Sequence, residues 1–163
     1  MQGTNTKERK VVYNADFGAF MLSPLARDLY YKRKYGKSLT HYLLEDYKEG
    51  GKATYRRVKI EEVGSRHVTS LSEDFGDVFT VELYKNADPL TQKYNRALVF
   101  LDDKVKRHDP ILVGVVEELG QRAGDSLKVK IINSRAYKIE DWDGKEEIIE
   151  ADMEDWYIID DDD

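Results

Sequence analysis

The chain has 163 residues, enough for one domain that buries most of the surface exposed by its unfolded form. Its hydrophobic fraction is 40%, its charged fraction is 36% and its net charge is −6, which exclude a membrane-embedded or disordered class and indicate a globular protein with a polar surface. It has no cysteine, which excludes disulfides, thiolate metal sites and thiol nucleophiles.

The first two elements follow from local signals near the N-terminus. The β-branched and aromatic run VVYN, residues 11–14, predicts a strand. Ser23 is a good N-cap residue and Pro24 fits the first helical position without losing a hydrogen bond. Gly36 permits a left-handed stop, so a helix is predicted over 24–35.

The middle of the chain has weaker signals. Glycines break up residues 37–76, where we expect a helix near 38–48 followed by irregular strands. Alternation in VFTVELY predicts a strand over 78–84. The stretch DPLTQKYNRALVFL, residues 88–101, fits both helical spacing and a buried strand, and we favour a short helical turn followed by a strand near 96–102.

The stretch RHDPILVGVVEELG predicts a helix over 110–119. Asp109 caps its start, Pro110 takes the first helical position, and the apolar residues that follow recur at helical spacing. Gly120 ends the helix. The interior Gly114 costs about 1 kcal/mol relative to alanine, so we expect another element to pack closely against it.

Strand signals return after this helix. The run LKVKIIN predicts a strand over 127–133. The stretch YKIEDWDGKEEIIE predicts a β-hairpin with strands at 137–142 and 145–150, because Asp143 and Gly144 form the dipeptide that favours a type I′ turn.

These elements predict an α+β fold: a single domain over 10–159 with a mixed or antiparallel sheet, two to three helices and a C-terminal hairpin. Residues 1–9 and the acidic tail 160–163 are expected to be flexible. Trp156 and Tyr157 belong to an apolar run just before that tail. We expect this run to dock on the sheet of its own chain, with addition to a partner's sheet as the alternative.

His108 and Arg107 precede the predicted helix 110–119. A catalytic histidine needs an orienting partner, but the Asp109 carboxylate faces the helix amides as a cap. His108 and Val113 instead occupy the two positions of a hydrophobic staple. We therefore interpret His108 as structural. Arg107 either pairs with the acidic hairpin or contacts a ligand.

No catalytic residue, metal site or cofactor is predicted. The other histidines are His41 and His67, and none of the three has the spacing that places two metal ligands together. All three are expected in loops or at the surface. The sequence also lacks phosphate-binding loops and nucleophile elbows, which lowers the expectation of an enzyme.

The segment ARDLYYKRKYGK combines cations with tyrosines, a pattern suited to phosphates and stacked bases. Arg33 and Lys34 lie in it, and Arg56 and Arg57 could extend the patch. The structural alternative is that cations in the last helical turn interact favourably with the helix dipole. An acidic protein is a poor general nucleic-acid binder, so this function is the second choice.

The charge is distributed unevenly along the chain. Residues 1–70 carry 14 basic and 8 acidic side chains, a net +6, whereas residues 71–163 carry 12 and 24, a net −12. Such a distribution favours head-to-tail association or a charged partner.

Three blocks, VVYNADFGAFMLS, RHDPILVGVVEELG and YKIEDWDGKEEI, together resemble a protein family of large double-stranded DNA viruses, of the marseillevirus and iridovirus sort, and of tailed phages. The family has no established enzyme activity, so the resemblance implies a viral setting rather than a mechanism. Its members often have a Gly-Gly pair where this chain has Phe17-Gly18-Ala19, which bears on how closely the backbone can approach there.

The function expected from these features is that of a non-enzymatic viral binding or regulatory protein, which acts through contacts with host or viral proteins, as in host takeover, and forms a homodimer. Nucleic-acid binding is the alternative, and a small hydrolase of a nucleotide or phosphodiester comes third. No apolar run could cross a bilayer and no signal peptide is evident, so the expected location is inside the infected host cell or in the virion. The candidate binding residues are Arg33, Lys34, Arg56, Arg57, Arg107, Trp156 and Tyr157.

Overall fold

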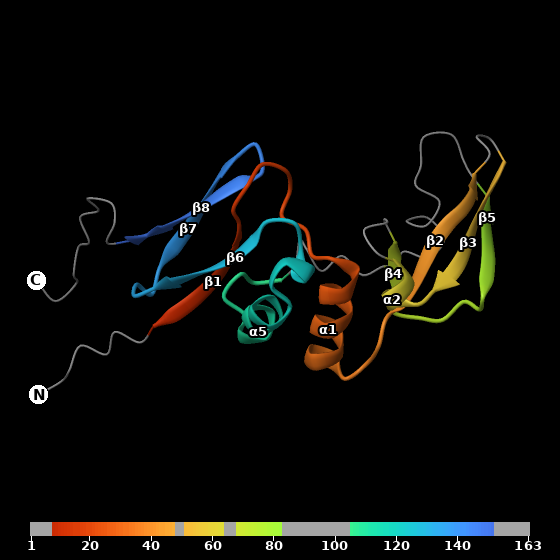
Figure 1. The fold of residues 1–163 in the computed structure, drawn as a ribbon, viewed down its shortest axis with the longest axis horizontal. Coiled ribbons are helices and arrows are strands. Elements are labelled where there is room, and N and C mark those ends of the chain that lie inside the picture. Colours follow the sequence, from red (N-terminus) through yellow and green to blue (C-terminus); the bar gives the residue numbers. More distant parts are fainter. Residues whose placement is uncertain (1–7, 48–50, 64–67, 83–104, 152–163) are drawn as a thin grey trace, which may run out of the picture. The chain divides into compact units, whose positions relative to one another are not determined.

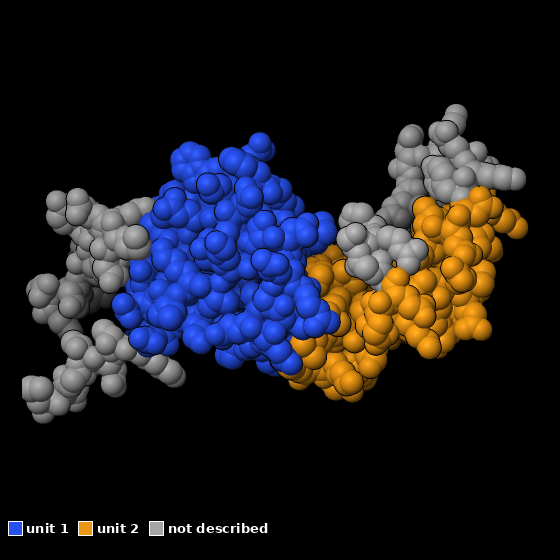
Figure 2. Space-filling view, in the orientation of Figure 1, with its two compact units in different colours: residues 1–21, 105–163 blue, residues 22–104 orange. Residues whose placement is uncertain are grey.

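The chain folds into helices and antiparallel sheets, which confirms the predicted α+β class. The computed structural model describes residues 8–47, 51–63, 68–82 and 105–151. The chain divides into two compact units, coloured separately in Figure 2: residues 1–21 with 105–163 are unit 1, and residues 22–104 are unit 2. No helix among the described residues is long and apolar enough to cross a membrane.

Unit 1 joins the two ends of the sequence. Its elements are β1 (Arg9–Asn14), α5 (Pro110–Leu119), the 3-10 helix η1 (Gly120–Ala123), β6 (Leu127–Ile132), β7 (Tyr137–Trp142) and β8 (Lys145–Glu150). β1 pairs with β6, and β7 pairs with β8 (Figure 1). The strands predicted at 11–14 and 127–133 are thus confirmed, as is the hairpin with both of its strand boundaries.

The β1–β6 ladder lies between α5 and the hairpin (Figure 1). Val11 and Ile132 are buried against Ile148 of the hairpin. Because side chains alternate along a strand, Lys10 points to the opposite face, where its Nζ atom lies 2.9 Å from a carboxylate oxygen of Glu117 on α5. The apolar face of α5 is buried through Leu112, Val113, Val115 and Val116.

The predicted ends of α5 and the predicted hairpin turn are confirmed. The Asp109 carboxylate accepts a hydrogen bond from the Ile111 amide at 2.9 Å, and Gly120 ends the helix with φ of 57°. Asp143 and Gly144 have φ of 59° and 91°, as a type I′ turn requires.

Unit 2 contains a four-stranded antiparallel sheet in the order β4-β2-β3-β5. Its elements are α1 (Pro24–Tyr35), β2 (Thr40–Tyr47), β3 (Lys52–Val58), α2 (Ile60–Val63), β4 (Thr69–Leu71) and β5 (Val78–Glu82). The helix predicted over 24–35 is confirmed: the Ser23 hydroxyl accepts from the Ala26 amide at 3.1 Å, and Gly36 ends the helix with φ of 71°. β5 confirms the strand signal at 78–84 over its first five residues.

The helix predicted near 38–48 is wrong, because this segment forms β2. Leu39, Tyr42 and Leu43 recur at helical spacing, which made the prediction plausible. β2, however, pairs with β3 along one edge and with β4 along the other. Hydrogen bonds to two neighbouring strands, together with complete burial of Tyr42, override a weak local preference.

The core of unit 2 is aromatic. The rings of Tyr42 and Phe79 meet edge to face with centroids 4.7 Å apart, and Tyr55 stacks on Phe79 at 5.2 Å. The Tyr42 hydroxyl accepts from the Phe75 amide and donates to the Gly76 carbonyl, each at 2.9 Å. The sheet is therefore tied to the turn before β5.

The predicted strand near 96–102 lies outside the described residues.

The prediction that another element packs against Gly114 is wrong. A Cβ atom at this position would meet no heavy atom within 4 Å, apart from the adjacent helix backbone. Gly114 therefore costs helix stability without a compensating close contact.

We predict that Gly114→Ala raises the free energy of unfolding by about 1 kcal/mol, because alanine loses less conformational freedom in a helix interior. Urea denaturation of the full chain measures this change. Gly144→Ala is the matched control with the opposite sign: its φ is 91° and the added Cβ would overlap the Gly18 carbonyl. Destabilisation by Gly114→Ala would contradict the open environment assigned to α5.

Candidate functional site

Arg107 and Glu146 form a buried ion pair in unit 1. Nη1 lies 2.5 Å from Oε1 and Nη2 lies 2.9 Å from Oε2, and the two side chains are only 16% and 6% exposed. The backbone N–H of Asn14 also donates to Glu146 Oε1, at 2.8 Å. This confirms the interpretation that Arg107 pairs with the acidic hairpin. We call Asn14, Arg107 and Glu146 the arginine node.

The Asn14 side chain links two turns through hydrogen bonds. Its Nδ2 atom lies 2.7 Å from the Gly144 carbonyl oxygen, 2.9 Å from that of Asp16 and 3.2 Å from that of Gly18. The Gly18 amide donates to the Asp143 carbonyl at 3.2 Å. Any side chain at Gly144 would overlap Gly18, so this close approach depends on glycine.

The three sequence blocks VVYNADFGAFMLS, RHDPILVGVVEELG and YKIEDWDGKEEI each contribute one residue to the arginine node. Asn14 comes from the first block, Arg107 from the second and Glu146 from the third. Phe20, also of the first block, covers the guanidinium with its ring centroid 3.5 Å from the Arg107 Cζ atom. This distance suits a cation–π interaction.

Above these turns lies an exposed group that we call the aromatic tip: Asp16, Phe17, Asp141, Trp142, Asp143 and Lys145. Phe17 is 69% exposed and Trp142 is 61% exposed. Trp142 and Lys145 are opposite each other in the β7–β8 register, so their side chains project from the same face. Lys145 Nζ lies 5.6 Å from the Phe17 ring centroid, which places both aromatic residues around one lysine.

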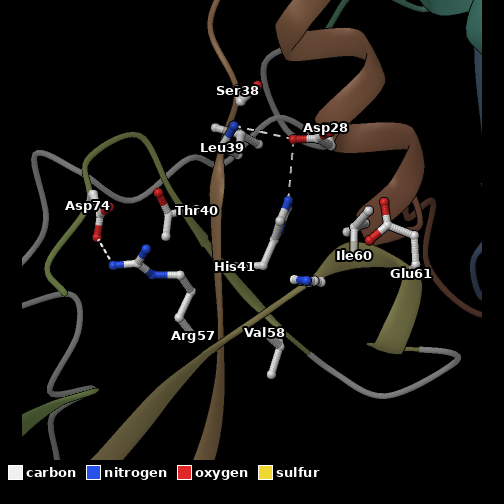
Figure 3. Close-up of a pocket in the computed structure, with 11 residues that line it drawn as sticks. Asp28, Ser38, Leu39, Thr40, His41, Arg57, Val58, Ile60, Glu61 and Asp74 are labelled. Atoms are coloured by element: carbon white, nitrogen blue, oxygen red, sulfur yellow. Dashed lines mark hydrogen bonds and ion pairs between the residues drawn. The ribbon is translucent and has the colours of Figure 1, made fainter. Parts of the chain in front are cut away.

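In unit 2, His41 links three elements. Its Nδ1 atom lies 2.9 Å from Ser70 Oγ on β4, and its Nε2 atom lies 3.4 Å from Asp28 Oδ1 on α1 (Figure 3). The expectation that His41 lies in a loop or at the surface is wrong, because this β2 residue is only 4% exposed. Its pairing on both sides by neighbouring strands buries it.

The hydrogen bond with His41 holds the pKa of Asp28 below its ordinary value of 3.8, against the opposing effect of burial. A hydrogen bond from the Leu39 amide at 3.2 Å lowers this pKa further. Asp28 is therefore a carboxylate at neutral pH. Asp28, His41 and Ser70 do not form the catalytic triad of a serine hydrolase. Ser70 is 4% exposed and does not line the adjacent cleft, whereas a nucleophile must reach its substrate.

The cleft beside His41 has a volume of about 340 Å³. Its lining includes five charged side chains of both signs: Asp28, Arg57, Lys59, Glu61 and Asp74. Figure 3 shows Arg57 directed at Asp74, with which it forms an ion pair. The cleft therefore presents charges of both signs rather than a basic surface for phosphates.

The candidate binding residues that the structure describes divide between the two units. Arg33 and Lys34 lie exposed on the last turn of α1. Arg56 lies 2.5 Å from a carboxylate oxygen of Glu45, and Arg57 pairs with Asp74 and, at 3.7 Å, with Asp77. Arg107 belongs to the arginine node of unit 1. The remaining two candidates, Trp156 and Tyr157, lie outside the described residues.

His108 is exposed and contacts the hairpin. Its Nδ1 atom lies 2.6 Å from the Tyr137 hydroxyl, and the two rings meet edge to face with centroids 5.7 Å apart. Burial raises the pKa of the Tyr137 hydroxyl, and Arg107 opposes this effect. His108 thus joins the start of α5 to β7, while the predicted staple with Val113 stays a prediction.

Comparison with protein families, curated proteins and solved structures finds no match to this chain. Within the part of the chain that the structure describes, no group of three His, Asp or Glu side chains could hold a metal ion.

We predict that Arg107→Met lowers the free energy of unfolding by about 3 kcal/mol, because it leaves the Glu146 carboxylate buried without its guanidinium. Thermal and urea denaturation measure the loss. Lys10→Met is the matched control, since it removes an exposed ion pair with Glu117 and should cost less than about 1 kcal/mol. Equal losses in the two variants would show that the buried ion pair contributes no more to stability than an exposed one.

We predict that Asp28→Asn lowers the free energy of unfolding at pH 7 by about 1 kcal/mol, through weaker hydrogen bonds with His41 and Leu39. Because the folded-state pKa of Asp28 is lowered, the charge stabilises the fold above pH 3.8, and this contribution is lost as the pH falls through the folded-state pKa. The difference from the parent chain should therefore shrink in acid. Asp77→Asn is the control, because its side chain is 94% exposed. A difference that grows in acid would contradict the assignment.

Proposed function

We propose that this protein is a non-enzymatic binding protein that acts through protein–protein contacts made by the aromatic tip. The observation that carries the proposal is the pair Phe17 and Trp142, which are 69% and 61% exposed on two adjoining turns. Large aromatic side chains contribute most of the binding energy at many protein interfaces. Their exposure together marks a surface suited to a protein partner.

The arginine node supports this proposal because it fixes the two turns that carry the aromatic residues. Asn14 donates to the carbonyls of Gly18 and Gly144, and Gly18 donates to Asp143. A binding residue on a fixed turn loses less conformational freedom when a partner arrives. The tip is therefore organised for binding before any partner is present.

The other two functions have less support. The hydroxyl that His41 contacts is that of Ser70, which is buried and does not line the cleft, so the support for a hydrolase there is weaker. Arg56 and Arg57 are paired with carboxylates, which reduces what they offer to a phosphate backbone. We favour protein contacts over both alternatives.

We also propose a viral setting, in which the protein regulates host functions inside the infected cell. The support is the resemblance of three blocks to a family of large DNA viruses and tailed phages. Those blocks contain Asn14, Arg107 and Glu146, the three residues of the arginine node. The sequence features on which the resemblance rests are therefore the ones that hold the turns of the aromatic tip in place.

We predict that Phe17→Ala combined with Trp142→Ala abolishes capture of the partner by the full chain. Affinity capture from infected host cells, followed by mass spectrometry, identifies proteins that the parent retains and the variant loses. With the purified partner, the variant should bind at least about 30-fold more weakly, since loss of a hot-spot residue costs about 2 kcal/mol or more.

The matched control is Leu44→Ala combined with Val78→Ala, which removes exposed apolar side chains from unit 2 that are 48% and 53% exposed. This control should retain the same proteins as the parent. Equal retention by the tip variant and the control, with both folded by circular dichroism, would contradict a binding role for the tip.

A further inference from the structure

We infer that the aromatic tip docks on the last turn of α1 in a second copy of this chain. This inference rests on the proposed function and names its partner. The receiving surface, which we call the basic turn, consists of Tyr31, Lys32, Arg33, Lys34, Tyr35 and Lys37.

The two surfaces have opposite charges. In the tip, Asp16, Asp141 and Asp143 outnumber Lys145, which leaves a net charge of −2. The basic turn carries four cations and no acidic residue, a net charge of +4. All of these charged side chains are exposed, so they can attract a partner before contact and orient it on arrival.

The two surfaces also match in their aromatic residues. Tyr31 and Tyr35 lie side by side on the basic turn with ring centroids 4.7 Å apart, and Tyr35 is 55% exposed. Phe17 and Trp142 can pack on such rings and present their faces to the guanidinium of Arg33. The contact thus combines apolar burial with cation–π attraction, where charge attraction alone would be weak in water.

Each chain carries one tip and one basic turn. In a two-fold dimer, the tip of each copy contacts the basic turn of the other, so the same contact forms twice. Two copies of a small contact reinforce each other because the second forms at a high effective concentration. The uneven charge of the sequence, +6 over residues 1–70 and −12 over residues 71–163, accords with such reciprocal pairing. The dimer is the homodimer expected from the sequence, now with a defined contact.

Charge exchange between the two surfaces tests the inference. The tip-reversed variant is Asp16→Lys with Asp143→Lys, which changes the charge of the tip from −2 to +2. The turn-reversed variant is Lys32→Glu with Arg33→Glu and Lys34→Glu, which changes the charge of the basic turn from +4 to −2. Sedimentation velocity of the full chain over a range of concentrations measures self-association, and circular dichroism establishes that each variant is folded. The parent should dimerise, with a dissociation constant that rises at least about tenfold between about 0.05 M and about 0.5 M salt, because salt screens exposed charges.

Each reversed variant alone should remain monomeric where the parent is dimeric, because both of its surfaces then have the same sign. An equimolar mixture of the two variants should form a heterodimer. In it, the tip of each variant faces a turn of opposite charge on the other variant. Recovery in the mixture also shows that both variants are folded. A parent that is monomeric throughout, or a dimer that both reversals leave intact, overturns the inference.

The outcome is separable from that of the proposed function. A monomeric parent whose capture of another protein is lost with Phe17→Ala and Trp142→Ala refutes the second copy as partner but leaves the binding function in place. If those two substitutions change neither self-association nor capture, both proposals fail.

Discussion

Unit 1 depends on the buried ion pair between Arg107 and Glu146. Removing two charges from water costs several kcal/mol, and this cost is offset only when the remaining hydrogen-bonding positions are filled. Here the carboxylate accepts hydrogen bonds from two guanidinium N–H groups and from the backbone N–H of Asn14. Because the three residues belong to β1, the turn before α5 and β8, the pair stabilises the fold only when three distant segments have come together.

Electrostatics and surface shape are linked through Asn14. Its amide donates to Glu146, while its side chain holds the carbonyls of Gly18 and Gly144. The backbone of one residue thus completes the buried ion pair, and the side chain of the same residue sets the turns beneath the aromatic tip. A change inside the node should therefore reach the exposed surface through a short and continuous set of contacts.

Local chemistry made much of the fold predictable. Ser23 and Asp109 identified both long helices because capping is an interaction within four residues, and the hairpin turn is encoded by two residues. Segment 38–48 was mistaken for a helix because its conformation is set by pairing with β3 and β4, which lie outside the segment. The environment of His41 could not be predicted for the same reason, since Asp28 and Ser70 are 13 and 29 residues away. Of the candidate site, the acidic hairpin made a partner for Arg107 foreseeable, but no local pattern singled out Asn14.

Stability alone does not account for a buried ion pair at this place, because apolar residues of similar volume can often replace such a pair without loss. A bidentate guanidinium–carboxylate contact adds directionality, since its two parallel hydrogen bonds fix the relative orientation of both groups. Directionality matters for the hairpin, where a shift of one residue would move Trp142 to the opposite face. The ion pair between Arg107 and Glu146 therefore favours a single placement of Trp142, opposite the Lys145 that faces Phe17. A stable core can tolerate several such placements, whereas a surface that recognises a partner requires one.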